Sequence, residues 1–416
     1  MLRLRTVIFY FSLLLCFLKS SGKAQEYFDY QAATPCDLRV IEAMMLYFST
    51  EFGNPSAPHA FGERAVTALS EARQKIARLL GGKAANWIFT SGATEANVLA
   101  ICGVMRAAPQ CKNHIIVCAT EHKSILETCR SLTQQGYTLT VLPVDREGRL
   151  SLDLLKKSFR PETMLVSIMA ANNEIGVIHP VAQIADICRK RGVLFHTDAT
   201  QAIGLIPFSV SLIGADLVSF SGHKIYGPKG IGALYVASHV KIAPLLFGGG
   251  QERGLRAGTE PVALCVGLAK ALEIAEALRS QEGRRLARLQ SLFLRRLQML
   301  KGWRLNGSLQ ERLPNNVNIS IEGVDREDLL PALPDFALST GSACTSEAHF
   351  SHVLAALDPE DTSPPAALRI SFGRGTTGAS VRHLADRLIE VVQRLRATKP
   401  AAGKRACKTK KTEVRI

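Results

Sequence analysis

A lysine at position 224 occupies a setting that suits a reactive amine beside a bound phosphate compound. Lys224 follows Ser221-Gly222-His223, which comes directly after the apolar run 217–220, and Gly227 and Gly230 stand close behind it. An amine held at the end of a buried strand can form a Schiff base with pyridoxal 5'-phosphate (PLP), a cofactor that carries a phosphate group. Considered alone, the same residues are equally typical of a surface lysine in a glycine-rich turn.

Other polar side chains that follow apolar runs match what PLP requires of a protein. Asp198 ends the run 193–198, and a carboxylate there is costly unless the protonated pyridine nitrogen of PLP pairs with it. The alternative is that Asp198 caps the next helix. Gln201 and Asn173 carry amides that can reach the oxygen on the cofactor ring, although either can be a turn residue. His122 is placed to stack on the ring, although a lone histidine is more often structural.

The segment 91–97 opens a predicted helix directly after a short strand-like run. Free N–H groups and the helix dipole attract anions at such a start. The segment therefore predicts a phosphate site at Ala93 and Thr94, which Ser221 and His223 would complete. An ordinary helix start is the alternative, because helix caps have similar sequences.

The elements that must position these residues alternate along the chain. From about residue 138, short β-rich runs alternate with amphipathic helical stretches such as Val181–Arg191. Near-continuous apolar strands with intervening helices predict an α/β fold with a mostly parallel sheet covered on both faces. The predicted strands are 138–144, 164–171, 193–200, 217–223 and 231–236.

After Thr259 the pattern changes to long helix with isolated strands, which predicts a smaller α+β C-terminal domain. The helix 262–300 is expected to break near Gln281-Glu282-Gly283, and a strand at 317–322 and a helix near 325–333 follow. We therefore expect a signal-like or presequence-like segment at 1–24, a large PLP-binding domain at 25–260, a small domain at 261–398 and a basic, disordered tail at 399–416.

The charge distribution argues against a nucleic-acid-binding protein. The net charge is +15, but residues 25–398 hold 40 basic and 35 acidic residues, so most of the excess lies at the two ends. Charged tails are usually solvated and do not recognise a nucleic-acid sequence. The ten cysteines form no CxxC pair, which argues against a zinc site or a disulfide framework and favours reduced thiols.

The first 24 residues leave the compartment open. Arg3 and Arg5 precede an apolar run over 6–18, as in a secretory signal peptide cleaved after Ala24. The run is short for a membrane span, and an organelle presequence, a membrane anchor or a start codon placed too far upstream are the alternatives. We expect the folded protein in the cytoplasm or an organelle matrix.

Six segments, in one order along the chain, resemble the cysteine desulfurases of the NifS/IscS kind. These are fold-type I PLP enzymes of the class V aminotransferase superfamily, and the resemblance runs from about Tyr27 to Arg396. It implies PLP as the cofactor, with the Schiff base on Lys224, the pyridinium partner at Asp198 and a catalytic His122 on the ring. The segments are 89–97, 120–124, 172–177, 196–201, 221–236 and 248–259.

The resemblance also implies the remaining site residues. The segment 338–346 resembles the family's catalytic-cysteine loop, with Cys344 as the sulfur acceptor and as a transient iron–sulfur ligand, and no resident metal is implied. Arg369 matches the arginine that binds the substrate carboxylate together with Asn173. The planar guanidinium of arginine suits this task better than the amine of lysine, because it can donate two parallel hydrogen bonds to one carboxylate. Thr259 matches a residue that reaches the phosphate of the partner subunit, so a homodimer is implied.

The implied reaction converts L-cysteine to L-alanine and leaves a persulfide on Cys344. The sulfur then passes to an acceptor protein, either an iron–sulfur scaffold or a thiol acceptor. Because a thiol is little ionised at neutral pH, His122 or the substrate's own thiolate must deprotonate Cys344. A selenocysteine lyase is the nearest alternative, and a non-catalytic regulatory subunit of the same fold is another. The residues after Arg396 do not resemble the scaffold-docking segment of IscS-type enzymes.

Overall fold

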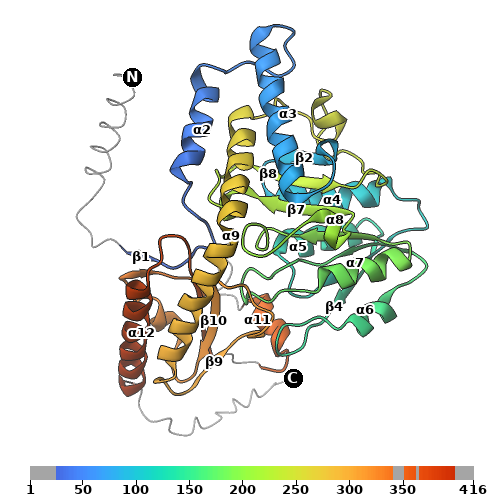
Figure 1. Ribbon diagram of the computed structural model, residues 1–416. Coiled ribbons are helices and arrows are strands. Elements are labelled where there is room, and N and C mark those ends of the chain that lie inside the picture. The colour runs from blue at the N-terminus through green and yellow to red at the C-terminus, as the bar shows by residue number, and fades with distance from the viewer. Residues whose placement is uncertain (1–24, 341–350, 362–364, 399–416) are drawn as a thin grey trace, which may run out of the picture.

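A seven-stranded sheet forms the centre of the larger part of the protein. This computed structural model (Figure 1) describes residues 25–340, 351–361 and 365–398. The strand order is β2-β8-β7-β6-β5-β3-β4. β8 is antiparallel to both of its neighbours and the other pairs are parallel, which confirms the predicted α/β fold. The strands are β2 (Trp87–Thr90), β3 (His114–Cys118), β4 (Thr138–Leu142), β5 (Thr163–Ser167), β6 (Leu194–Asp198), β7 (Leu217–Ser221) and β8 (Gly232–Val236).

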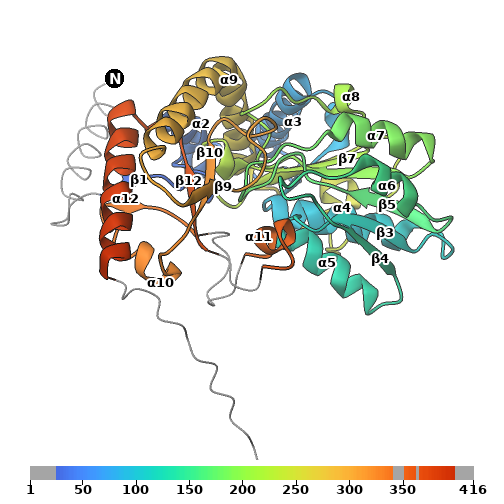
Figure 2. The same cartoon turned by 90° about the horizontal axis from the view of Figure 1, so that it is seen from below.

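Helices cover both faces of this sheet because alternate strand residues point to opposite sides. In β3, Ile115 and Val117 join a cluster with α4 (Ala93–Ala107) and α5 (Lys123–Thr133). Ile116 and Cys118 join a second cluster on the other face, and Figure 2 shows the two helical layers with the sheet between them. The second cluster includes residues of α2 (Leu38–Ser49), α3 (Ala60–Leu80), α7 (Val181–Lys190) and the first part of α9 (Val262–Leu297).

The helix α9 is continuous, so the predicted break near residues 281–283 is wrong. One glycine inside a helix costs only about 1 kcal/mol relative to alanine. The neighbouring Glu282 and Arg285 form an ion pair one turn apart, and Arg285 also donates to the carbonyls of Gly373 and Thr376. These contacts hold the helix through the position where the sequence suggests an interruption.

A smaller antiparallel sheet packs against the far end of α9. Its order is β12-β10-β9, and with α12 (Gly378–Thr398) it encloses a separate hydrophobic cluster that includes Phe293 and Leu297 of α9. This is the α+β arrangement expected after Thr259, while the residue limits of the four predicted parts stay predictions. The strands are β9 (Trp303–Leu305), β10 (Asn316–Ile321) and β12 (Ala366–Ser371), with α10 (Arg326–Leu329) beside them.

The N-terminal segment links the two regions. β1 (Glu26–Tyr27) pairs in parallel with β11 (Phe336–Ala337), and Phe28 lies in the cluster of the smaller sheet. The chain then crosses to the large sheet, where Thr34 donates to the carbonyl oxygen of His223. Residues 26–34 therefore contact both parts of the molecule.

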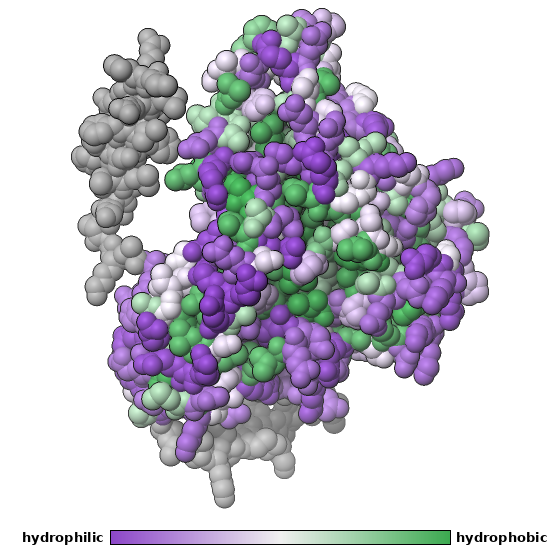
Figure 3. Space-filling view, in the orientation of Figure 1, coloured by the Kyte–Doolittle hydropathy of each residue, from purple (hydrophilic) through white to green (hydrophobic). Residues whose placement is uncertain are grey.

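Apolar side chains are exposed over α2 and the start of α3. Met45, Phe48, Phe52 and Phe61 are all exposed, and Figure 3 shows hydrophobic residues at the surface over α2. None of the helices within 25–340, 351–361 and 365–398 is long and apolar enough to cross a membrane. The predictions for residues 1–24 and 399–416 fall outside the described residues.

Candidate active site

One cavity of about 570 Å³ gathers almost all of the predicted site residues at the carboxyl ends of the parallel strands. Loops that follow parallel strands converge at one edge of a sheet, which is where α/β proteins bind ligands, and the volume is that of a small-molecule site. The predicted residues that line the cavity are Ala93, Thr94, His122, Asn173, Asp198, Gln201, Ser221, His223, Lys224 and Arg369.

Lys224 lies in a short 3-10 turn directly after β7. Its Nζ atom donates to the carbonyl oxygens of Gln31 and Ala32 at 2.5 and 2.7 Å. Gln31 and Ala32 also line the cavity. Sequence reasoning gave this N-terminal segment no role at the site, because it lies almost 200 positions from Lys224.

Asp198 is buried at the end of β6, and both of its carboxylate oxygens are held. Oδ1 accepts from the backbone N–H of Thr200 at 2.9 Å, and Oδ2 accepts from the amide of Asn97 at 2.7 Å. Asn97 is fully buried in α4 and also donates to Ser124. The cap-like contact to Thr200 therefore exists, but Asn97 supplies a second contact that a simple cap does not need.

His122 is the N-cap residue of α5. Its Nδ1 accepts from the backbone N–H of Ser124 at 3.1 Å and pairs with the hydroxyl of the same residue at 2.8 Å. Burial lowers the pKa of His122, and Lys224 and His352 lower it further while Asp198 acts in the opposite direction. A neutral imidazole whose Nδ1 is an acceptor carries its proton on Nε2, so Nε2 is a hydrogen-bond donor.

The start of α4 and the end of β7 form the predicted phosphate end of the cavity. Ala93 and Thr94 are the first residues of α4, where backbone N–H groups are free of intrahelical partners. Ser221 adds a hydroxyl and Lys229 a positive charge, and both line the cavity. Burial lowers the pKa of His223 to about 4, with Lys224 and Lys229 acting in the same direction, so its ring is neutral at pH 7.

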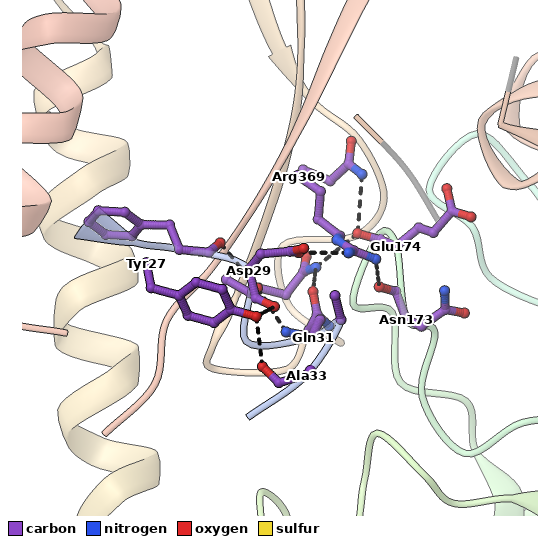
Figure 4. Close-up of polar contacts among 12 residues, drawn as sticks. Tyr27, Asp29, Gln31, Ala33, Asn173, Glu174 and Arg369 are labelled. Atoms are coloured by element: carbon purple, nitrogen blue, oxygen red, sulfur yellow. Dashed lines mark hydrogen bonds and ion pairs between the residues drawn. The ribbon is translucent and has the colours of Figure 1, made fainter. Parts of the chain in front are cut away.

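Arg369 is the most deeply buried charged residue of the cavity, with 1% of its surface exposed, so a surface ion pair is excluded. It lies in β12, and its guanidinium donates to Asp29 at 2.7 Å and to the carbonyl oxygen of Asn173 at 3.0 Å. Figure 4 shows the guanidinium between these two residues. Asp29, like Gln31, was not among the predicted site residues.

Two predicted residues do not line the cavity. Thr259 is exposed, so its assigned contact with a partner subunit stays a prediction. Cys344 lies outside the described residues. On the N-terminal side of the segment 341–350, Ser339 pairs through its backbone with Arg369, which lines the cavity.

On the other side of that segment, Ser351 donates to the buried carboxylate of Glu174. The next residue, His352, donates from Nε2 to the carbonyl oxygen of Glu121 at 2.9 Å, one position before His122. Both residues belong to the start of α11 (His352–Leu357), of which Ser351 is the N-cap. Sequence reasoning missed Glu174 and His352, although Glu174 stands next to Asn173 in a segment it had singled out.

Comparison with known proteins assigns the family. The model for class V aminotransferases matches residues 26–384. The chain is 46% identical over 379 residues to cysteine desulfurase IscS of Rickettsia felis, covering 90% of this chain and 92% of that protein. The protein of the same name from Rickettsia rickettsii is 45% identical over the same shares.

Solved structures that superpose on this chain indicate the same family. A NifS-like protein superposes with a TM-score of 0.84 at 36% identity, covering 89% of this chain and 100% of that one. SspA in complex with cysteine superposes with a TM-score of 0.74 at 35% identity, covering 83% and 98%. The chain belongs to the class V aminotransferase family. Within that family it belongs with the cysteine desulfurases, which confirms the resemblance and the enzyme class predicted from the sequence.

Proposed function

We propose that the protein binds PLP in this cavity and uses it to convert L-cysteine to L-alanine, with transfer of the substrate sulfur to Cys344. The observation that carries the proposal is that Lys224, Asp198 and Arg369 line one cavity although they come from different elements of the fold. A structural neighbour whose title names bound cysteine supports the same substrate.

The side chains present fit PLP. The cavity offers a lysine amine, a buried carboxylate and, at the start of α4, N–H groups and hydroxyls suited to a phosphate. Lys224 would hold the cofactor, Asp198 its pyridine nitrogen, and Ala93, Thr94, Ser221 and His223 its phosphate. Gln201 and Asn173 would contact the ring oxygen, and His122 would stack on the ring. When bound, PLP supplies an electron sink for the substrate's α-carbon.

The protein residues then divide the remaining tasks. Arg369 binds the substrate carboxylate through the N–H groups that Asp29 and Asn173 leave free, with the side chain of Asn173 beside it. Lys224 takes the proton from the α-carbon. His122 donates from Nε2, because its Nδ1 caps α5. This arrangement favours the substrate's own thiolate, rather than His122, as the base that deprotonates Cys344.

A homodimer fits the exposed apolar side chains of α2, α3 and the segment between them, such as Phe48, Phe52 and Phe61. In a dimer the exposed Thr259 would reach the phosphate site of the partner subunit. Subunit exchange tests this: Lys224→Ala and Thr259→Ala proteins are each expected to be impaired. Their mixture regains activity, because one mixed site combines an intact Lys224 with an intact Thr259. Failure to regain activity in a proven mixed dimer would remove Thr259 from the partner's site.

The sulfur acceptor is proposed as a protein thiol or an iron–sulfur scaffold, in the cytoplasm or an organelle matrix. No observation favours a selenocysteine lyase or a non-catalytic subunit. A Cys344→Ala variant that still turns over selenocysteine but not cysteine would favour the lyase.

The decisive experiment measures L-alanine and sulfide released from L-cysteine by the wild type and by Cys344→Ser. The variant is expected to bind cysteine but release no alanine, since a hydroxyl stays protonated and attacks sulfur poorly. Mass spectrometry of the treated wild type should find one added sulfur, about 32 Da, on the peptide with Cys344. The buried Cys118 is the matched control. The competing candidate is Cys407 in the basic tail, because neighbouring positive charges favour a thiolate. A persulfide on Cys407 that survives Cys344→Ser would overturn the assignment.

A further inference from the structure

The guanidinium of Arg369 is already paired with a carboxylate of the protein. Nη2 donates to Oδ1 of Asp29 at 2.7 Å, and Nη1 donates to the carbonyl oxygen of Asn173 at 3.0 Å (Figure 4). Arg369 lines the cavity, whereas Asp29 is not among the lining residues. The Asp29 carboxylate therefore contacts Arg369 from outside the cavity.

Arg369 keeps donors free for a second anion. A guanidinium has five N–H donors, and two of them are used by Asp29 and Asn173. Nε is buried and has no partner among the described residues. A substrate carboxylate that binds Arg369 would therefore share one guanidinium with the carboxylate of Asp29.

The backbone around Asp29 is fixed without help from its side chain. Asp29 forms a parallel bridge with Ser371 in β12, and the N–H of Ser371 donates to the carbonyl oxygen of Phe28 at 2.7 Å. The hydroxyl of Tyr27 donates to the carbonyl oxygens of Asp29 and Ala33 at 3.0 and 2.9 Å. A change confined to the Asp29 side chain should leave its position intact.

Two carboxylates on one cation repel each other, and the repulsion is strong where water is scarce. The Arg369 side chain is 2% exposed and that of Asp29 17% exposed, so solvent screens the pair only in part. An enzyme that binds L-cysteine through its carboxylate must also release L-alanine, which has the same carboxylate. A cation without a competing anion would retain that product.

We propose that Asp29 is a positioning residue that orients Arg369 and limits its affinity for amino-acid carboxylates, so that L-alanine leaves. The inference rests on the proposed role of Arg369 as the carboxylate-binding residue. Asp29 touches neither substrate nor cofactor and acts only through Arg369. The affinity of the site for amino-acid carboxylates is therefore set partly by a residue that does not line the cavity.

Two substitutions separate charge from orientation. Asp29→Asn keeps an oxygen that accepts from Nη2 but removes the negative charge, while Asp29→Ala removes both. Calorimetric titration of the PLP-loaded protein with L-alanine, which does not react further, gives the dissociation constant directly. Asp29→Asn is expected to bind L-alanine about tenfold more tightly, with lower KM for L-cysteine and lower kcat. Asp29→Ala should bind L-alanine more weakly than Asp29→Asn, because the guanidinium loses its fixed orientation.

Cysteamine, which is cysteine without the carboxylate, is the matched control ligand, and its affinity should be the same in wild type and Asp29→Asn. Unchanged or weaker L-alanine binding by Asp29→Asn would overturn the charge effect, and so would an equal gain for cysteamine. Equal L-alanine affinity in the Asn and Ala variants would overturn the orienting role. Asp29→Ser offers the same comparison if the Asn variant does not accumulate in folded form.

Arg369→Lys distinguishes a failure of the proposed carboxylate role of Arg369 from a failure of the proposed role of Asp29. A lysine keeps the charge but loses the planar fork, so L-alanine binding should weaken at least tenfold. If Arg369→Lys binds L-alanine as the wild type does, the proposed carboxylate role of Arg369 fails and the inference fails with it. If Arg369→Lys weakens binding but Asp29→Asn does not strengthen it, only the inference on Asp29 fails.

Discussion

The amide of Asn97 donates to Oδ2 of Asp198 across 2.7 Å, so a helix on one face of the sheet holds the carboxylate at the end of a central strand. Asn97 is fully buried, and the same amide group also donates to Ser124. The orientation of Asp198 is thus set by α4, the helix whose first residues form the proposed phosphate site. In the proposed site, this one helix would position both the pyridine nitrogen and the phosphate of the cofactor.

Asn97→Ala should weaken PLP binding about tenfold, because the loss of one buried hydrogen-bond partner costs about 1–3 kcal/mol. The measurement is the dissociation constant of PLP, followed by its visible absorbance during titration of the cofactor-free protein. Asn97→Asp is the matched variant, since it keeps the shape but places a second carboxylate beside Asp198, and it should bind PLP more weakly still. Wild-type affinity in both variants would show that Asp198 needs no such support.

Lys224→Ala should lose the visible absorbance of enzyme-bound PLP and all turnover, because among the described residues no other lysine occupies this position in the cavity. Asp198→Asn should still bind PLP but turn over at least a hundredfold more slowly, since an amide cannot balance the charge of the pyridinium. Absorbance spectra and alanine release measure the two effects separately. Cofactor trapped by borohydride on another lysine would refute the assignment of Lys224. Near-normal turnover by Asp198→Asn would show that Asp198 serves only as a helix cap.

His122→Asn separates the structural and catalytic roles of this histidine. Asparagine is among the best N-cap residues, so its side-chain oxygen should replace Nδ1 at the start of α5 and leave the melting temperature nearly unchanged. Activity should fall by about 10²–10⁴ because the Nε2 donor is lost. His122→Ala is the control, and it should lose both activity and about 1 kcal/mol of stability. If the His122→Asn protein is as active as the wild type, the role of His122 is structural only.

Stability should fall as the pH falls from 6.5 towards 4, because several histidines are buried in neutral form. Burial lowers the pKa of His179 and of His196 from 6.5 to about 4. In that window the unfolded chain binds a proton at each site and the folded protein does not, so the free energy of the unfolded state is lowered and the protein is destabilised.

His179 offers the cleanest test, since neither ring nitrogen has a partner among the described residues. His179→Phe should reduce the slope of unfolding free energy against pH by up to about 1.4 kcal/mol per pH unit between pH 6.5 and 5. Urea denaturation at pH 7.5, 6.0 and 5.0 measures this slope. Leu212, exposed at the surface, is the control, because its replacement by alanine removes no proton-binding group and should leave the slope unchanged. An identical slope in wild type and His179→Phe would contradict the prediction.

The sequence predicted best those site residues that follow strands. Asp198, Ser221 and Lys224 could be placed together because the carboxyl ends of parallel strands meet at one edge, whatever the detailed packing. The predicted strands often ran too far, as at 164–171, because the strand-end loops stay apolar up to the polar site residues. Strand β5 in fact ends at Ser167.

The residues that sequence reasoning missed act through long-range contacts. Asn97 is a helix residue whose only signal is polarity on a buried face, and Asp29 belongs to a segment without regular periodicity. Their partners are 101 and 340 positions away. No local pattern reports such a pairing, since it depends on how α4 and β12 pack after the chain has folded.

The pairing of Asp29 with Arg369 also bears on when the enzyme becomes competent during its synthesis. Every strand of the large sheet has been made once Val236 leaves the ribosome, but the N-terminal segment still lacks β11 and β12, against which it pairs. At 5–20 residues per second, Asp29 waits roughly 20–70 s for its partner. A nascent chain that ends before β12 can assemble the strand ends expected to hold the cofactor, yet it lacks the arginine proposed to grip the substrate.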